Sequence, residues 1–147
     1  MNSRSLLVLV GPTAVGKTAL SLRLAQQFNG EIVSADSRLF YRGLNIGSAK
    51  PSAAERAVVP HHLIDVCAPD ETLSLGEFRR LAYRAIDAIH ARGRLPILVG
   101  GTGQYVWAIV EGWGIPEVAP HPALRAALEA LGAGEPARWL VALDPTA

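Results

Sequence analysis

The sequence LLVLV at positions 6–10 runs directly into GPTAVGKT at positions 11–18, and this junction decides the fold of the chain. A short run of Leu and Val that stops at a glycine is typical of a strand buried on both faces of a parallel sheet. The second stretch fits the phosphate-loop pattern GxxxxGK[ST] at every fixed position, and apolar residues recur at helical spacing after Lys17. A strand, a glycine-rich loop and a helix in this order predict an anion-binding turn at the edge of an α/β sheet.

The phosphate loop supplies the candidate anion-binding residues. Glycine lets the backbone turn its N–H groups inward around phosphate oxygens at a helix N-terminus. Lys17 adds a positive charge, and the Thr18 hydroxyl is the usual ligand of a Mg²⁺ ion that bridges phosphates. A nucleoside triphosphate, a diphosphate ester and an inorganic anion all fit such a cradle. The predicted diphosphate-binding residues are Gly11, Pro12, Thr13, Ala14, Val15, Gly16, Lys17 and Thr18, with Thr18 as the metal ligand.

Further strands and helices alternate along the chain, which predicts a parallel sheet flanked by helices with ligands at the carboxyl ends of the strands. Ser74 and Glu77 form a capping box that marks a helix start. Residues 36–60 show no period and predict a long functional loop. Apolar patterning predicts strands at 31–35, 62–66 and 95–99, and helices at 17–28, 74–92, 102–110, 123–131 and 136–143.

The composition limits the class of protein. Half of the 147 residues are apolar and 18% are charged, so the chain can bury a core as a globular domain. Cys67 is the single cysteine, and no stretch approaches the ~20 apolar residues of a membrane span. A net charge of +1 offers no strong electrostatic footprint for nucleic acid. We expect a cytoplasmic protein without a disulfide or a membrane segment.

Polar residues follow two of the other predicted strands. Asp36 comes directly after the strand at 31–35, and Thr102 closes a Gly-Gly-Thr turn after the strand at 95–99. Because the carboxyl ends of parallel strands meet at one edge, both residues should lie near the phosphate loop. Asp36 is therefore a candidate general base, although an isolated Asp after a strand is more often a turn or cap residue.

Two other polar features have weaker functional interpretations. No Cys or carboxylate stands at a convincing ligand spacing from His61 and His62, which favours packing or capping over a metal site. Asp65 could be the acid that holds Mg²⁺ in a phosphoryl-transfer enzyme, and this interpretation stays open.

Four motifs taken together resemble the tRNA dimethylallyltransferases, also called tRNA isopentenyltransferases. They are GPTAVGKT at 11–18, ADSRLFYRGLNIGSAKP at 35–51, PHHLID at 60–65 and RLPILVGGTGQY at 94–105, in the order and spacing of that family. The resemblance implies a P-loop NTPase-like parallel sheet flanked by helices. It also implies transfer of a dimethylallyl group from dimethylallyl diphosphate to N6 of an adenosine adjacent to the anticodon of tRNA.

The resemblance further implies roles for individual residues. The phosphate loop would hold the diphosphate of the donor with Mg²⁺, and no phosphoryl transfer would occur. Asp36 corresponds to the general base of the family, and Thr102 to a threonine near the target adenine. The expected partners are dimethylallyl diphosphate and the tRNA anticodon stem-loop, bound by a monomer. The tRNA-binding positions would be Asp36, Ser37, Arg38, Leu39, Thr102 and Arg125.

The chain departs from the family pattern at two positions and in its length. Leu39 stands where many members carry glutamine, and Ser48 where the loop usually has threonine. Family members are considerably longer and continue into a helical tRNA-binding region. We therefore expect a P-loop catalytic core at 1–112, then a linker and the incomplete start of that region at 113–147, with weak or lost tRNA turnover.

Three other functions remain open at this point. A small-molecule kinase would hold ATP in the phosphate loop, with Asp36 accepting a hydroxyl proton. An adenylate isopentenyltransferase would transfer the same prenyl group to free AMP or ADP. A non-catalytic module would only bind a nucleotide or diphosphate. Labelled ATP against labelled dimethylallyl diphosphate, and AMP against an anticodon stem-loop, separate these functions.

Overall fold

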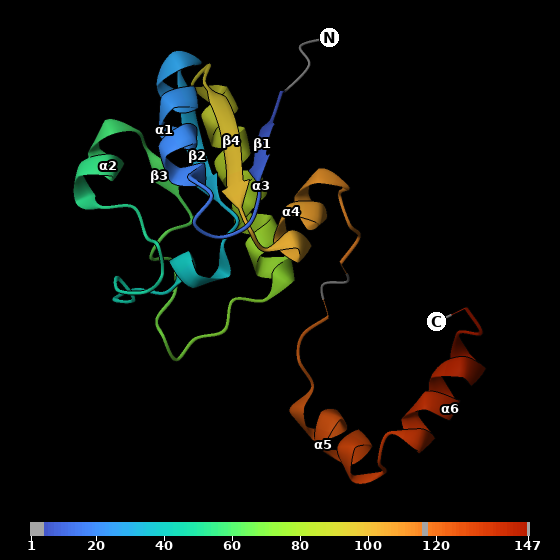
Figure 1. Ribbon diagram of the computed structural model, residues 1–147. Helices are drawn as coiled ribbons and strands as arrows, with labels where there is room; N and C mark the ends of the chain where they lie inside the picture. Colours follow the sequence, from blue (N-terminus) through green and yellow to red (C-terminus); the bar gives the residue numbers. More distant parts are fainter. Residues whose placement is uncertain (1–4, 116–117, 147) are drawn as a thin grey trace. The chain divides into compact units, whose positions relative to one another are not determined.

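The computed structural model describes residues 5–115 and 118–146, which fall into two compact units, one reaching Ile115 and the other starting after it (Figure 1). The first unit holds strands β1 (Leu7–Val10), β2 (Gly30–Ser34), β3 (His61–His62) and β4 (Leu95–Gly100), with helices α1 (Lys17–Gln27), α2 (Ala53–Val58), α3 (Leu75–Ala91) and α4 (Gly103–Val110) and the 3₁₀ helix η1 (Ser37–Phe40). The second unit holds helices α5 (Pro122–Ala130) and α6 (Gly134–Leu143).

The strands form one parallel sheet in the order β1-β4-β2-β3. β4 lies between β1 and β2, with Val10 opposite Gly100 and Ser34 opposite Val99. The carboxyl ends of these three strands are therefore level with one another, and the loop that follows each strand starts at the same edge. The parallel sheet flanked by helices that the sequence predicts is confirmed.

Helices cover both faces of the sheet, because successive residues of a strand point to opposite faces. Ile32 and Ile97 pack with Ala25 of α1, whereas Val33 and Leu98 pack with residues of α3 and α4. All four strand residues are buried. The central strands therefore consist largely of apolar residues, as is typical of parallel sheets with helices on both faces.

The third strand is shorter than its sequence suggests. An apolar pattern predicts a strand at 62–66, but the structure has only His61–His62, paired with Ile32 and Val33 of β2. Leu63 and Asp65 adopt left-handed backbone angles, with φ of 61° and 58°. This conformation is incompatible with an extended strand, so the chain turns away from the sheet.

The long connection after β2 contains two short helices. The sequence predicts only a loop here, because its apolar residues follow no regular period. η1 begins directly after Asp36, and α2 starts at a capping box in which Ser52 and Glu55 bind each other's backbone N–H groups. The sequence pattern Ser-x-x-Glu at 52–55 is the signal that could have found α2.

The second unit carries Arg125 on helix α5. His121 caps this helix, since its Nδ1 accepts a hydrogen bond from Leu124 N–H at 3.0 Å, and Pro122 occupies the first turn. Within residues 5–115 and 118–146, no helix has the length and apolar character needed to cross a membrane.

Candidate active site

The phosphate loop is shaped to receive an anion. Gly16 has φ of 91°, and Ala14 has φ of 64°, so the loop curls before α1 begins at Lys17. Within the described ranges, no side chain caps α1 and no acidic residue lies in its first turn. The N–H groups at this helix start are therefore free to bind phosphate oxygens, and the helix dipole favours a negative charge there.

The side chain of Lys17 folds back over the loop. Its Nζ donates hydrogen bonds to the carbonyl oxygens of Gly11 at 2.9 Å and Pro12 at 2.6 Å. The ammonium group thus lies at the loop, where it can bind an anion that enters the cradle.

The turn after β4 packs closely against both neighbouring loops. A Cβ atom at Gly100 would overlap the carbonyl group of Ala35 and lie 2.8 Å from the Cβ of Ala35. A Cβ atom at Gly101 would lie 3.3 Å from the carbonyl oxygen of Gly11 and 3.9 Å from Lys17 Nζ. The two glycines therefore allow the ends of β1, β4 and β2 to approach one another.

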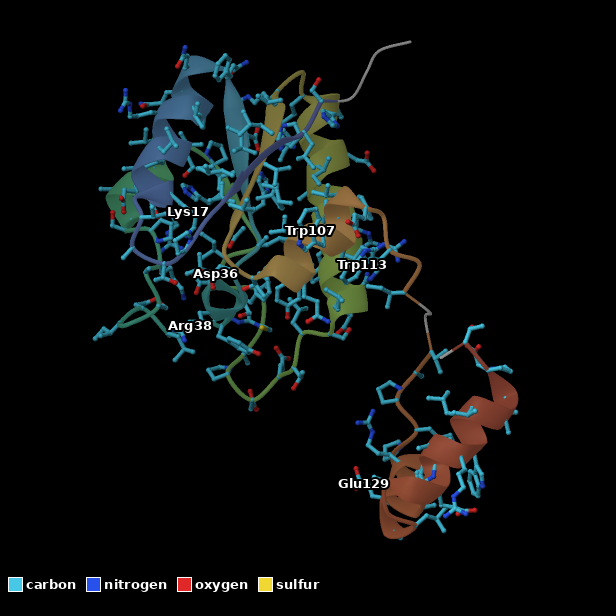
Figure 2. All side chains as sticks on the ribbon, turned by 45° about the vertical axis from the view of Figure 1, so that its right-hand side comes forward. Lys17, Asp36, Arg38, Trp107, Trp113 and Glu129 are labelled. Atoms are coloured by element: carbon cyan, nitrogen blue, oxygen red, sulfur yellow. The ribbon has the colours of Figure 1, made fainter. Side chains whose placement is uncertain are left out.

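Asp36 stands at this edge and caps η1. Its Oδ1 accepts a hydrogen bond from Arg38 N–H at 3.0 Å, and its own N–H donates to Ser34 Oγ at 3.4 Å. Figure 2 shows Asp36 and Lys17 at the same end of the sheet. The capping role that the sequence offered as an alternative is therefore present. The second carboxylate oxygen accepts no hydrogen bond from any residue that the structure describes. The cap therefore leaves this oxygen available to a bound ligand.

An aromatic cluster connects the turn of Asp36 with that of Thr102. The ring of Phe40 in η1 lies 5.5 Å from Phe78 of α3 and 5.4 Å from Tyr105 of α4, and the last two are 4.6 Å apart. Burial raises the pKa of the Tyr105 hydroxyl. Thr102 caps α4 through its carbonyl oxygen, and its side chain makes no capping hydrogen bond. The hydroxyl of Thr102 is thus not used to cap α4.

The remaining predicted tRNA-binding positions fall in different surroundings. Arg38 is exposed, whereas Ser37 and Leu39 are half-buried. Leu39 lines a cavity of about 30 Å³ together with Thr18 of α1. Ser48, the other departure from the family pattern, is buried and donates to the carbonyl oxygen of Leu44 at 2.6 Å. Arg125 belongs to the second unit.

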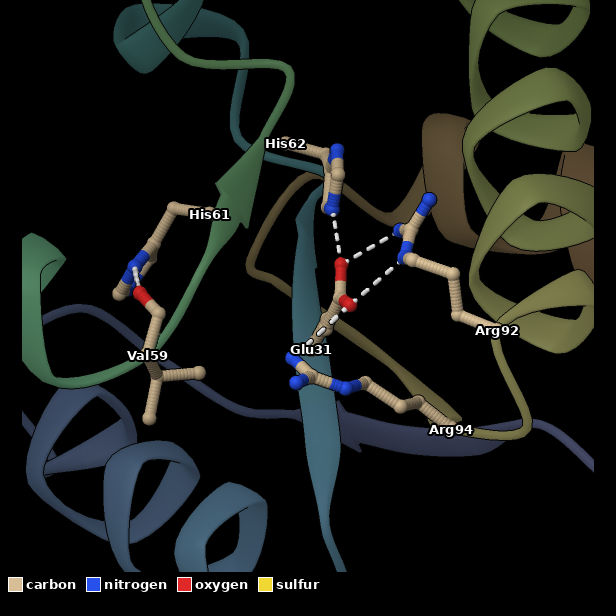
Figure 3. Close-up of polar contacts among 6 residues, drawn as sticks. All are labelled: Glu31, Val59, His61, His62, Arg92 and Arg94. Atoms are coloured by element: carbon tan, nitrogen blue, oxygen red, sulfur yellow. Dashed lines mark hydrogen bonds and ion pairs between the residues drawn. The ribbon is translucent and has the colours of Figure 1, made fainter.

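The two histidines after α2 have protein partners. His61 Nδ1 lies 2.8 Å from the carbonyl oxygen of Val59, and burial lowers the pKa of His61. His62 Nε2 lies 2.6 Å from Glu31 Oε2, and Figure 3 draws this contact as a dashed line. His61 thus contacts a backbone carbonyl oxygen, and His62 pairs with a carboxylate of the neighbouring strand, a contact that the sequence did not predict.

Asp65 has an ion-pairing role that the sequence did not predict. Lys50 Nζ contacts its Oδ1 at 2.7 Å, and Arg56 contacts its Oδ2 at 3.0 Å. These hydrogen bonds, that of Lys50 above all, lower the pKa of the Asp65 carboxyl. With both oxygens bound by cations, Asp65 is poorly suited to hold Mg²⁺ for a kinase. No local pattern marks this pairing, because the partners lie in separate motifs.

An apolar cavity of about 490 Å³ adjoins the phosphate loop. It lies between β1, the turn after β4 and helix α4, where Val10 and Trp107 are more than half exposed. An anion cradle beside an apolar cavity suits a ligand with a charged head and a hydrocarbon tail. The lining residues are Val8, Val10, Gly11, Pro12, Gly100, Gly101, Gly103, Val106, Trp107 and Val110.

The known proteins that resemble this chain are named as dimethylallyl or isopentenylpyrophosphate transferases of tRNA. A tRNA dimethylallyltransferase from Roseiflexus sp. (strain RS-1) is 62% identical over 146 residues, covering 97% of this chain and 48% of the relative. The crystal structure of the tRNA isopentenylpyrophosphate transferase of Bacillus halodurans is similar with a TM-score of 0.75 and 46% identity, over 97% of this chain and 48% of that chain. A eukaryotic dimethylallyltransferase acting on tRNA has a TM-score of 0.78 and 32% identity, over 95% of this chain and 36% of that chain.

The family follows from these similarities. The chain spans about half the length of the curated relatives it matches. A sequence model described as IPP transferase matches residues 39–147. Since this match covers most of the chain, and the Roseiflexus relative covers 97% of it, the chain belongs to the IPP transferase family.

Proposed function

We propose that this chain carries the donor site and the general base of an enzyme that transfers a dimethylallyl group to tRNA. The acceptor is N6 of an adenosine adjacent to the anticodon, and the donor is dimethylallyl diphosphate. The protein acts as a cytoplasmic monomer. The observation that carries the proposal is the meeting of an anion cradle, an acid with one unengaged oxygen and an apolar cavity at one sheet edge.

The phosphate loop binds the diphosphate of the donor. The loop N–H groups and Lys17 hold the oxygens on which negative charge develops as the bond to C1 of the prenyl group breaks. Donors that are already in place when this charge appears stabilise the transition state strongly. The cavity beside Trp107 receives the apolar prenyl group.

Mg²⁺ fits the residues present at this loop. The hydroxyl of Thr18 is a hard oxygen ligand in the first turn of α1. Within 5–115 and 118–146, no group of three or more His, Cys, Asp or Glu side chains gathers that could hold a metal ion. Thr18, the donor oxygens and water would therefore hold the ion, and Mg²⁺ commonly binds in this way. When bound, it neutralises charge on the diphosphate.

Asp36 serves the acceptor. The exocyclic amine of adenine has its lone pair drawn into the ring, so a nearby carboxylate assists by orienting it and accepting a proton. The C–N bond to the prenyl C1 forms, the C1–O bond to the diphosphate breaks, and the N6 proton passes to Asp36. The adenine must first leave its stack, which is easier in a loop than in a duplex.

The tRNA contacts are assigned to both units. Thr102 lies near the adenine, and the turn after β2, where Arg38 is exposed, contacts the RNA together with α5. Residues 1–112 act as the catalytic core, and residues 113–147 begin the helical tRNA-binding region. Because the chain spans about half of its relatives, we expect slow transfer to RNA by this chain alone. The contacting residues are Asp36, Ser37, Arg38, Leu39, Thr102 and Arg125.

Donor and acceptor assays test the proposal. The chain is incubated with labelled dimethylallyl diphosphate or γ-labelled ATP, each with an anticodon stem-loop or AMP. We expect label in the stem-loop from the prenyl donor only. Binding of dimethylallyl diphosphate is measured in parallel by calorimetry, with pyrophosphate as a competitor. Labelled phosphate on an acceptor, prenylated AMP without prenylated RNA, or no donor binding would each contradict the proposal.

A further inference from the structure

A buried ammonium group lies beside the turn that carries Asp36. The side chain of Lys50 is only 2% exposed, and its Nζ donates to Asp65 Oδ1 at 2.7 Å and to the carbonyl oxygen of Tyr41 at 2.8 Å. A buried charge is unfavourable unless it is paired and hydrogen-bonded, and here both conditions are met. One nitrogen atom therefore joins the residue that follows η1 to the segment after β3.

The backbone beside Lys50 forms a seam between residues 39–42 and residues 65–67. Asp65 N–H donates to the carbonyl oxygen of Leu39 at 3.0 Å, and Cys67 N–H donates to that of Phe40 at 3.0 Å. Arg42 N–H donates back to the carbonyl oxygen of Cys67 at 2.9 Å. This seam, which we call the η1 seam, holds the end of η1 against the segment after β3.

The turn that carries Asp36 is thus fixed at both ends. At its start, Ala35 N–H donates to the carbonyl oxygen of Val99 at 2.8 Å, which ties it to β4. At its end, the η1 seam and Lys50 hold it. Between these points the hydrogen bonds of 36–39 are local ones: Asp36 N–H to Ser34 Oγ at 3.4 Å, Arg38 N–H to Asp36 Oδ1 at 3.0 Å and Leu39 N–H to the Asp36 carbonyl oxygen at 3.1 Å. These bonds shape the turn, whereas the seam and Lys50 hold its far end against the segment after β3.

The segment opposite Lys50 adopts an unusual backbone conformation. Leu63 and Asp65 both have left-handed φ angles, of 61° and 58°, which leucine in particular rarely adopts. This path brings the Asp65 carboxylate to Lys50, and Arg56 of α2 binds the other oxygen at 3.0 Å. A strained path that persists is held by its surroundings and points to a positional requirement.

We propose that Lys50 and Asp65 are positioning residues that hold the Asp36 turn in place for the acceptor, separately from the phosphate loop. This inference rests on the proposed function, because it assumes that Asp36 acts on the acceptor. We call the pair Lys50 and Asp65 the clamp. Whether the clamp holds the Asp36 turn, and not the phosphate loop, can be tested without measuring catalysis.

Amide hydrogen exchange and thiol labelling of the Lys50→Met chain test the clamp. We expect exchange at Arg38, Arg42 and Cys67 to accelerate at least about tenfold, since the seam opens locally. Exchange at Leu20, whose N–H donates to the Gly16 carbonyl oxygen in α1, should stay unchanged. Cys67 is the single cysteine and is 5% exposed, so its reaction with a disulfide reagent should accelerate similarly. Equal acceleration at all sites, or none at the seam, would overturn the clamp.

Two further variants control this experiment. Glu71→Gln removes an ion pair with Arg42 that is 3.8 Å long and 59% exposed on both sides, keeps a side-chain oxygen to accept the Ala68 N–H, and should leave amide exchange in the seam unchanged. Because burial, and after it the charge of Glu71, raises the pKa of Cys67, this control is read by amide exchange and not by thiol labelling. Arg56→Met removes the half-exposed partner of Asp65 and should open the seam in the same direction, to a smaller extent. If Lys50→Met does not fold, the exchange measurement on Arg56→Met takes its place. Seam amides that exchange no faster in Arg56→Met than in the unaltered chain would then reject the clamp.

Transfer assays separate the clamp from the proposed function. Lys50→Met should bind dimethylallyl diphosphate within about twofold of the unaltered chain, while single-turnover prenylation of the stem-loop falls about 10²-fold, as misplaced catalytic groups commonly cause. A purely structural role would weaken donor binding as well. If the unaltered chain neither binds dimethylallyl diphosphate nor transfers a prenyl group, the proposed function fails, whereas the exchange pattern still decides the clamp.

Discussion

The Oδ1 atom of Asp36 is bound by Arg38 N–H at 3.0 Å, whereas no described residue donates a hydrogen bond to its Oδ2. Capping and base catalysis are often treated as alternative explanations for an Asp after a strand. Here the cap fixes the direction of the carboxylate and leaves one oxygen to receive a proton. The two interpretations that the sequence offered are therefore compatible.

Asp36→Asn separates capping from base catalysis, because the asparagine amide oxygen can still accept the hydrogen bond from Arg38 N–H. We expect prenyl transfer to slow by a factor of about 10² to 10⁴, since the amide accepts no proton. Single-turnover prenylation of an anticodon stem-loop measures the rate, and calorimetry with dimethylallyl diphosphate checks that donor binding is unchanged. A variant that transfers within tenfold of the original rate would remove Asp36 as the base.

Lys17→Met tests the anion cradle. The variant loses a charge-assisted hydrogen-bond donor at the loop, so pyrophosphate should bind about 10- to 100-fold more weakly. Calorimetry with pyrophosphate measures the change. Arg23→Met, which removes an exposed charge from the same helix, should bind within about twofold of the unaltered chain. Equal weakening by both substitutions would indicate a general charge effect rather than a contact.

The elements approach closely at the end of β4, which makes one glycine necessary. A Cβ at Gly100 would meet the backbone of Ala35, which is fixed by its hydrogen bond to Val99. Gly100→Ala should therefore lower the free energy of unfolding by about 1–3 kcal/mol and displace the start of the Asp36 turn. Calorimetric melting measures the loss of stability. The control is Gly114→Ala, whose Cβ would meet no atom within 4 Å. Melting of both variants at the same temperature would disprove the close approach.

Local patterns predicted the elements whose own residues determine them. The run at 6–10, the phosphate loop and the capping box at Ser74 all depend on neighbours in sequence, and each appears at its expected place. The expectation that the first strand is buried on both faces was wrong, because β1 lies at the edge of the sheet and Val10 is 57% exposed. The strand predicted at 62–66 was wrong because its apolar residues pack in a left-handed turn. Hydrophobic periodicity reports burial, and burial does not require an extended backbone.

The polar contacts between distant segments could not be predicted in the same way. Lys50 with Asp65, and Glu31 with His62, pair only after the register of β2 and β3 is set. Asp36 and Thr102 were predictable as neighbours of the phosphate loop, because the carboxyl ends of parallel strands always share an edge. The candidate site followed from topology, whereas the residues that position it are brought together only by the folded structure.

At the scale of the molecule, a buried carboxylate holds the sheet to its helices at the edge opposite the candidate site. The side chain of Glu31 on β2 is 2% exposed and contacts His62 of β3 at 2.6 Å (Figure 3). Arg92, at the end of α3, contacts it at 2.7 Å, and Arg94, before β4, at 3.2 Å. The hydrogen bond from Arg92 contributes most to lowering the pKa of Glu31 to about 2, against the opposing effect of burial.

This lowered pKa predicts how the free energy of unfolding depends on pH. The carboxyl of Glu31 has a folded pKa of about 2 and an ordinary value of 4.5, so its contribution is complete above pH 4.5 and disappears as the pH falls toward 2. The shift corresponds to a contribution of up to about 3 kcal/mol. Other carboxyl groups titrate in the same range. The difference in the free energy of unfolding between the unaltered chain and Glu31→Gln therefore isolates the contribution of Glu31. Urea unfolding, followed by NMR signals of β2, should show the variant less stable at pH 6, with the gap closing toward pH 2. A gap that stays constant over this range would mean that packing, and not the charge of Glu31, joins these elements.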